Sequence, residues 1–362
     1  MVKNVYIHIP FCRQKCHYCS FVSFPKPDLI DKYLVSLEQE IKNKYEAENL
    51  NTLYFGGGTP SLLNIKDFER LINLFNTDDK TEITSELNPE HLDYEYLKNL
   101  KAIGINRISL GCQTFDSNIL KIIGRKHSPQ DVINSVNNAQ KAGFNNINLD
   151  FIYGLPNQSI ESFANDLTRA CNLGIQHISL YGLKIDEGCH FYNNPPENIA
   201  DEDIQAEMYL KAIEILKFNN FEHYEISNFA KENYPSNHNL NYWNNNSYYG
   251  FGVSAHGYVN GVRYSNNDNL QDYIENPFTH KFEHKVTNQE KLEEEIFLGF
   301  RKMHGININE INKKFGINFL EKYSTIVKKY IDTKYLIETN TGFKLSDSGI
   351  LISNSILSEF IE

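Results

Sequence analysis

The first two thirds of the chain alternate short apolar segments with amphipathic helical segments, and this alternation limits the available folds more than any other feature. Such a pattern is typical of βαβ units, in which successive strands are parallel and helices cover the sheet. The first unit joins a predicted strand at 5–9 to a predicted helix at 31–45. Five further strands are predicted at 52–55, 82–87, 107–110, 147–151 and 177–181. The sequence therefore predicts an α/β fold, a partial barrel of six strand–helix units.

The pattern changes after about residue 285, where charged helical segments replace the strand–helix alternation. A chain of 362 residues exceeds one average domain, so we expect a large domain at 1–285 and a small one at 286–362. The predicted elements of the small domain are three helices, at 289–303, 308–315 and 319–331, and an Asn-Thr-Gly hairpin at 336–345. This order resembles a winged helix, a fold that often binds DNA. The segment lacks a strongly basic recognition helix, although Lys313, Lys314, Lys328 and Lys329 are present, so we expect an interaction or lid domain.

Composition excludes several classes of protein. The formal net charge of −11 argues against sequence-independent nucleic-acid binding, which depends on Lys and Arg neutralising phosphates. No apolar run approaches the ~20 residues that span a bilayer, and the N-terminus has no apolar signal segment. We therefore expect a cytoplasmic protein whose thiols stay reduced, with Cys112, Cys171 and Cys189 as ordinary packing residues.

Three cysteines, Cys12, Cys16 and Cys19, lie within eight residues directly after the first predicted strand. A closed cubane cluster takes four thiolates and a closed zinc site takes four Cys or His ligands, so three cysteines leave one coordination position open. Zinc is an alternative because His8 and His17 are near, but a C-x3-C-x2-C spacing lacks the paired C-x2-C arms of most zinc sites. The triplet therefore predicts a metal centre with room for another ligand.

Polar or glycine-rich segments follow the ends of the other predicted strands. In α/β barrels the carboxyl ends of the strands carry the functional site. A glycine run often marks only a tight turn and a glutamate usually lies on the surface, so neither feature is specific alone. Glycines also let a ligand approach the backbone closely. The candidates from these segments are Gly57, Gly58, Thr59, Glu86, Gln113 and Asp150.

The cysteine spacing, with the aromatic Tyr18 before the last cysteine, resembles the signature of radical S-adenosylmethionine (SAM) enzymes. The resemblance implies that the three cysteines bind three irons of a [4Fe-4S] cluster and that SAM chelates the fourth. It also implies SAM contacts from Gly57 with its neighbours Gly58 and Thr59, and from Glu86, Gln113, Arg125 and Asp150, with Tyr6 and Tyr18 beside the cluster. Arg125 has an alternative interpretation, because residues 124–127 could form a solvated helix end.

Residues 8–12, 55–61, 107–111 and 153–156 resemble the oxygen-independent coproporphyrinogen III oxidase family, and the likeness covers nearly the whole chain. That family contains coproporphyrinogen dehydrogenases and HemW-type haem chaperones. The dehydrogenases have a fourth cysteine two residues after the third, where this chain has Phe21, and an extension ahead of the cluster, where this chain reaches Cys12 at once. Both differences favour the chaperone group.

The segment His238-Asn239-Leu240-Asn241-Tyr242-Trp243 matches the H-N-x-x-Y-W motif of the HemW group. The resemblance implies haem binding, with the imidazole of His238 on the iron and with Tyr242 and Trp243 stacked on the porphyrin. Two alternatives stay open. His238 could instead hydrogen-bond a loop while Trp243 plugs the open side of the barrel, or His256 could be the iron ligand.

The predicted function is that of a haem chaperone with a SAM-bound [4Fe-4S] cluster, which passes haem to an acceptor such as a membrane respiratory enzyme. An electron donor such as a flavodoxin is expected, and nucleic acid is not. The alternative is a radical SAM dehydrogenase that decarboxylates the propionates of coproporphyrinogen III. A DNA-binding regulator ranks last, because it requires a basic surface that the sequence does not show.

Overall fold

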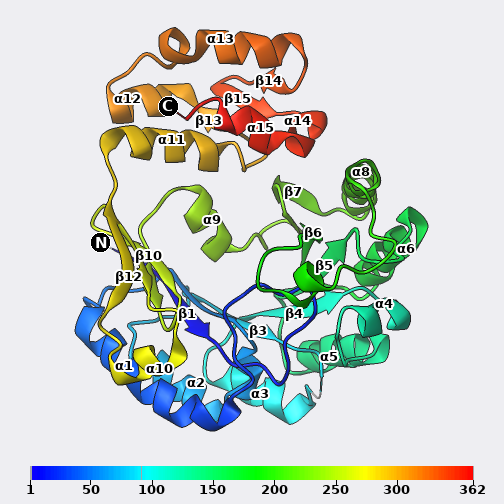
Figure 1. Cartoon of the computed structure of the whole chain (residues 1–362), viewed down its shortest axis with the longest axis vertical. Helices are drawn as coiled ribbons and strands as arrows, with labels where there is room; N and C mark the ends of the chain where they lie inside the picture. The colour runs from blue at the N-terminus through cyan, green and yellow to red at the C-terminus, as the bar shows by residue number, and fades with distance from the viewer. Residues whose placement is uncertain (1, 91, 362) are drawn as a thin grey trace.

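The computed structural model describes residues 2–90 and 92–361, and a sheet of parallel strands organises the larger part of it (Figure 1). Six strands follow one another both in the chain and across the sheet, each parallel to its neighbour. They are β1 (Asn4–Ile9), β2 (Thr52–Gly57), β3 (Glu82–Leu87), β4 (Arg107–Gln113), β5 (Ile147–Tyr153) and β6 (His177–Gly182). The predicted partial barrel of six units is confirmed, and each strand begins within one residue of its expected start.

Helices between these strands cover the outer face of the sheet (Figure 1). Several begin with a capping box, in which the first and fourth residues satisfy each other's backbone N–H groups, as Ser128 and Asp131 do. The helices are α1 (Ile30–Lys44), α2 (Ile65–Ile72), α3 (Tyr94–Ala102), α4 (Ser117–Ile122), α5 (Pro129–Lys141) and α6 (Ile160–Cys171). A long helix, α8 (Glu202–Phe218), follows β6 and packs on α6.

Three short strands extend the sheet beyond the six that the sequence predicts. Antiparallel β8 (Asn228–Ala230) and β7 (Glu222–Glu225) continue it beyond β6, and β9 (Tyr249–Phe251) pairs in parallel with β1. Strands of three or four residues are too short to show a periodic pattern, so no pattern in the sequence predicted them. The pairing with β9 brings residues 249–256 beside the strand that leads into the cysteines.

A second, three-stranded sheet and a short helix stand at the side and the amino end of the barrel (Figure 1). The sheet consists of β10 (His256–Val259), β11 (Val262–Asn266) and β12 (His280–Lys285), with α10 (Leu270–Glu275) between the last two. The short helix, α9 (Asn237–Trp243), contains the H-N-x-x-Y-W motif. The first two backbone N–H groups of α9 donate hydrogen bonds to the carboxylate of Glu82, which is the first residue of β3. The motif therefore lies at the amino ends of the strands, opposite the cysteines.

The C-terminal part forms its own layer of helices around a small antiparallel sheet (Figure 1). The predicted helices and hairpin are present, although the first helix ends at Gly299 rather than 303. Phe300, Phe319 and Phe360 form part of a second apolar core, which also includes Tyr209 of α8. The elements of the C-terminal part are α11 (Asn288–Gly299), β13 (Ile306–Asn307), α12 (Ile308–Phe315), α13 (Phe319–Asp332), β14 (Leu336–Glu338), β15 (Gly342–Leu345), α14 (Asp347–Leu351) and α15 (Ser353–Ser358).

Within the described ranges, none of the helices combines the length and the apolar character that crossing a bilayer requires.

Candidate cluster and cofactor site

The three cysteines lie on the loop between β1 and α1, and all three line one cavity of about 580 Å³ inside the barrel. Each is a free thiol. Thr59 Oγ1 lies 3.5 Å from Cys12 Sγ and Arg125 Nη1 lies 3.8 Å from Cys16 Sγ, so polar groups from the end of β2 and from the segment after α4 approach the sulfurs. The loop thus presents three sulfurs to an enclosed space at the carboxyl end of the barrel.

The donor set fits a cluster better than a single ion. Across residues 2–90 and 92–361, no three Cys, His, Asp or Glu side chains converge on one metal position. A tetrahedral zinc site needs such convergence, whereas a cubane places each cysteine on a different iron. The histidines near the loop are already bonded, since His8 contacts Val22 O at 2.8 Å and His17 contacts Ile122 O at 2.8 Å. The alternative of a zinc site therefore loses its predicted fourth ligand.

The glycines after β2 allow a close approach of backbone segments. Gly57 has a φ of +110°, and a Cβ there would lie 2.4 Å from the ring of His8. At Gly58 a Cβ would lie 2.6 Å from the carbonyl oxygen of Phe11. Side chains at either position would push the cysteine loop away, so both glycines hold that loop against the end of β2.

Glu86 stands at the end of β3 with its carboxylate inside the barrel. It accepts hydrogen bonds from Tyr54 Oη at 2.9 Å and from Gly57 N at 3.1 Å. Burial, together with the charge of Asp150, raises the pKa of Glu86 to about 7. A cationic ligand in the cavity would stabilise the ionised form of this carboxyl group.

Asp150, in β5, lies beside Glu86 on the cavity wall. Its oxygens accept hydrogen bonds from Ser109 Oγ at 2.9 Å and from Asn148 Nδ2 at 2.8 Å. Burial raises its pKa, although these hydrogen bonds offset part of the rise. Two adjacent buried carboxyl groups give this wall of the cavity a preference for hydroxyl, ammonium or sulfonium groups.

Arg125 follows α4 and turns inward, so it is not the solvated helix end of the alternative interpretation. Its Nη2 donates to Gly111 O at 2.6 Å and to Asn88 Oδ1 at 3.1 Å. Burial opposes the charge of the guanidinium, but nearby Tyr18 and Cys16 raise its pKa overall. Arg125 therefore holds a fixed positive charge next to the cysteine loop.

The structure brings all but one of the SAM-site candidates to the same cavity. Gln113 lines it with a φ of +67°, at a register shift between β4 and β5. Tyr6 is the exception, because it contacts His8 Nδ1 at 3.0 Å and stacks on Tyr54 instead of lining the cavity. The candidates that line it are Cys12, Cys16, Tyr18, Cys19, Gly57, Gly58, Thr59, Glu86, Gln113, Arg125 and Asp150.

The cavity wall also contains polar residues that the sequence analysis did not select. They occupy alternate positions on the strands, because every second residue of a barrel strand points inward. That alternation was a usable signal once the strands were assigned. The missed residues are Tyr54, Arg107, Ser109, Asn148, Ser179 and Tyr181 from the strands and Asn239 from α9.

His238 of the motif is fully engaged inside the protein. Its Nδ1 contacts Thr52 Oγ1 at 2.7 Å, its Nε2 contacts Tyr242 Oη at 2.8 Å, and its ring stacks on Tyr54. The side chain is 1% exposed, and burial lowers its pKa to about 3. In this conformation neither ring nitrogen can reach an iron atom, which favours the structural alternative for His238.

Trp243 packs away from the barrel. Its ring lies under the guanidinium of Arg301, 4.3 Å from the ring centre, at the boundary with the C-terminal helices. This cation–π contact covers one face of the indole.

His256 begins β10 with an exposed side chain, and it makes no hydrogen bond with any residue that the structure describes. It lies close enough to His8 for its charge to lower the pKa of that residue, after the larger effect of burial. The imidazole therefore lies near His8 of β1, and neither of its nitrogens has a hydrogen-bond partner among the described residues.

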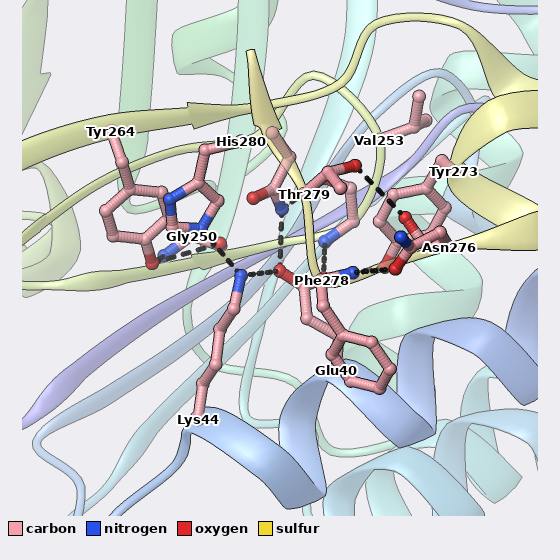
Figure 2. A network of polar contacts seen from close by, with 12 residues as sticks. Glu40, Lys44, Gly250, Val253, Tyr264, Tyr273, Asn276, Phe278, Thr279 and His280 are labelled. Carbon is pink, nitrogen blue, oxygen red and sulfur yellow. Dashed lines mark hydrogen bonds and ion pairs between the residues drawn. The ribbon is translucent and has the colours of Figure 1, made fainter. Parts of the chain in front are cut away.

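A buried carboxylate anchors the loop that leads to His256 (Figure 2). Glu40 of α1 accepts hydrogen bonds from Tyr273 Oη at 2.6 Å and from Gly252 N at 2.9 Å, and it pairs with Lys44 at 3.0 Å. Figure 2 shows Glu40 and Lys44 reaching from α1 toward this segment and toward His280. The position of His256 therefore depends on a network that joins α1, β9 and α10.

Comparison with known proteins shows which family has this fold and this arrangement of cysteines. The model of the radical SAM superfamily matches residues 6–170, and the HemN C-terminal domain model matches residues 286–352. A protein of Bacillus subtilis (strain 168) named "Heme chaperone HemW" is 36% identical over 99% of both chains. A protein of the same name from Lactococcus lactis is 36% identical over 99% of this chain and 97% of its own.

This chain belongs to the HemW family of radical SAM proteins. Membership implies a [4Fe-4S] cluster and SAM, and the cavity described above has the cysteines and the polar wall that both require. Among solved structures, coproporphyrinogen III oxidase (HemN) from Escherichia coli matches with a TM-score of 0.86 over 99% of this chain and 90% of its own. At 22% identity this likeness concerns the fold.

Proposed function

We propose that this protein binds haem and transfers it to haem-requiring acceptor proteins, and that its cluster is held by Cys12, Cys16 and Cys19. The observation that carries the proposal is the full-length similarity to relatives named as heme chaperones. Phe21 at the position of the fourth cysteine of the dehydrogenases supports the same choice. The acceptor is an apoprotein such as a membrane respiratory enzyme, and a flavodoxin-type protein supplies electrons.

SAM occupies the cavity against the carboxyl end of the barrel. Glu86 and Asp150 receive its hydroxyl and cationic groups, and Gly57, whose N–H already donates to Glu86, lines the same cavity. Arg125 fixes the cysteine loop through Cys16 and Gly111. When bound, the cluster and SAM supply one-electron chemistry, and these residues hold SAM and exclude water.

His256 is the proposed iron ligand, in place of His238. Haem iron takes a neutral imidazole, and partial burial lowers the pKa of His256, which favours that form. Unlike His238, it needs to break no hydrogen bond to reach a ligand. Tyr242 and Trp243, which the motif suggested as stacking partners, are packed on His238 and Arg301 and act as supports.

The function is tested by anaerobic haem titration of the cluster-reconstituted protein, followed by an assay with coproporphyrinogen III, SAM and a reductant. Stoichiometric haem binding without decarboxylation is expected. Decarboxylation with little haem affinity would replace the proposal with the dehydrogenase.

The ligand is tested with His256→Ala, which should weaken haem binding and change its absorption spectrum. His284→Ala is the matched control, because His284 is an exposed imidazole of the same small sheet that already pairs with Glu290. An unchanged spectrum in His256→Ala would contradict the assignment.

A further inference from the structure

Arg107, the first residue of β4, differs from every other charged group on the cavity wall. Its side chain is 2% exposed and lines the cavity. Within the described part of the chain it makes no hydrogen bond or ion pair, and its Nε is a buried donor without an acceptor. A buried charge is normally paired, because leaving it unpaired is among the most costly arrangements in a protein interior.

The two carboxylates of the cavity do not serve as its partners. Glu86 accepts from Tyr54 and Gly57, and Asp150 accepts from Ser109 and Asn148. Arg107 acts on both only through space, where its charge partly offsets the rise that burial causes in their pKa values. The hydrogen-bonding capacity of the guanidinium therefore remains unused.

Other unused polar groups lie around Arg107. Thr84, its cross-strand neighbour in β3, has a buried hydroxyl without a partner. Asn239 lines the same cavity from α9, and the structure gives its side-chain amide no hydrogen bond to a described residue. Because α9 lies at the amino ends of the strands, Arg107 and Asn239 form the floor of the cavity, at the end opposite the cysteines, and Thr84 lies beside Arg107 outside the lining.

We propose that Arg107 and Asn239 form a carboxylate subsite at the floor of the barrel cavity, which takes a propionate group of haem. This assignment rests on the proposed function and adds to it the part of the protein that recognises the acidic side chains of the cargo. A planar guanidinium binds a carboxylate through two parallel N–H···O bonds, and the amide of Asn239 can donate a third.

Both SAM and haem have carboxylates, and the position of the subsite indicates which of the two it binds. SAM also has a carboxylate, but radical SAM chemistry places that group on the cluster at the cysteine end. Haem has two propionates on one edge, so one of them can enter the barrel while the iron stays near the rim. The cavity extends from Cys12 to Asn239 and gives such an arm a continuous path.

The experiment compares haem with haem dimethyl ester, whose propionates carry no charge, in absorbance titrations of the full-length, cluster-reconstituted protein. We expect the wild type to bind the diacid roughly tenfold more tightly than the ester, because hydrogen bonds to charged groups contribute on this scale. Arg107→Met should reduce this preference to about twofold or less, and Arg107→Lys should keep part of it, since lysine retains the charge without the planar fork.

The matched control is Arg301→Met, which removes an arginine on the other side of α9, over Trp243. It should keep the wild-type preference for the diacid. Equal preferences in the wild type and Arg107→Met would overturn the subsite, even with haem binding intact. If Arg107→Met fails to fold, the ratio of diacid to ester affinity is compared between the wild type and Arg107→Lys instead. Equal ratios in these two proteins would then overturn the subsite.

Two further arms separate the alternatives. A loss of SAM affinity in Arg107→Met with an unchanged diacid preference would assign the carboxylate to SAM and overturn the haem assignment. If the wild type binds neither haem compound, the proposed function fails, and crystals soaked in sodium propionate then test Arg107 alone. A carboxylate on the guanidinium would support the subsite, and its absence there would overturn it.

Discussion

The motif residues at the two ends of the barrel differ in how far the protein has already satisfied their polar atoms. At the carboxyl end, the cysteines, Glu86 and Asp150 face a cavity, and their remaining capacity points into open space. At the amino end, His238 is enclosed, with Thr52 and Tyr242 on its two nitrogens. The comparison teaches that a residue of a recognisable motif is available to a ligand only when the protein has not already satisfied its polar atoms.

The largest expected effect concerns the carboxyl end. Cys16→Ala should abolish the cluster, because two remaining thiolates rarely hold a cubane. Iron and sulfide analysis of the anaerobically reconstituted protein measures this, and Cys171→Ala, outside the loop, should keep the wild-type content. Full iron and sulfide in Cys16→Ala would refute the cluster assignment.

The next largest effect tests the amino end. His238→Ala should destabilise the fold by about 2–4 kcal/mol, because it leaves the Tyr242 hydroxyl unpaired, removes one of the two partners of the Thr52 hydroxyl and opens a cavity. Urea denaturation measures the loss, and Tyr242→Phe, which removes one of the hydrogen bonds, should lose about 1 kcal/mol.

The same His238→Ala protein should retain its haem affinity within about twofold when folded, since the comparison makes this histidine a support. Normal stability combined with lost haem binding would show instead that His238 leaves its partners and binds the iron. The proposed difference between the two ends of the barrel would then not hold for His238.

A smaller effect follows from the ionisation of Glu86. Its pKa of about 7 lies above the ordinary 4.5, so the folded state retains a proton that the unfolded state releases between these values. Stability should therefore fall as the pH rises from about 4.5 to 7, by roughly 1–3 kcal/mol. Glu86→Gln should flatten this part of the stability profile in denaturation at several pH values. An identical slope in both proteins would show that Glu86 titrates normally.

The smallest effect concerns the contact between α9 and the C-terminal layer. Arg301→Gln should reduce the free energy of unfolding by about 0.5–1 kcal/mol, through loss of the cation–π contact with Trp243. Thermal unfolding followed by tryptophan fluorescence reports on this contact, because Trp243 is the single tryptophan of the chain. A change of more than about 2 kcal/mol would mean that Arg301 holds more than this ring.

The sequence predicted the barrel well because each of its strands is long enough to show a pattern and is followed by a marked segment. Arg107 and Asn148 were missed for a different reason. They lie at or near the starts of strands, where no motif draws attention, and only the closed sheet shows that they point into the cavity.

The role of His238 was beyond the sequence for a related reason. Its partner Thr52 is 186 residues away, and no local pattern predicts a hydrogen bond over that separation. The same limit applies to Glu40, whose partner Tyr273 lies 233 residues along the chain (Figure 2). Local patterns therefore recovered the elements, while the state of each polar atom required the assembled fold.

Helix α9 borders both the barrel cavity and the C-terminal layer of helices. One side of it closes the barrel with Asn239, and the other meets the segment directly after α11, where Arg301 covers Trp243 and Lys302 donates a hydrogen bond to Asn244. The helix covers only Asn237–Trp243, so both sets of contacts lie within about 10 Å of each other along its axis. A substitution that changes the contacts of Arg301 or Lys302 therefore acts on the same short helix that carries Asn239 into the cavity.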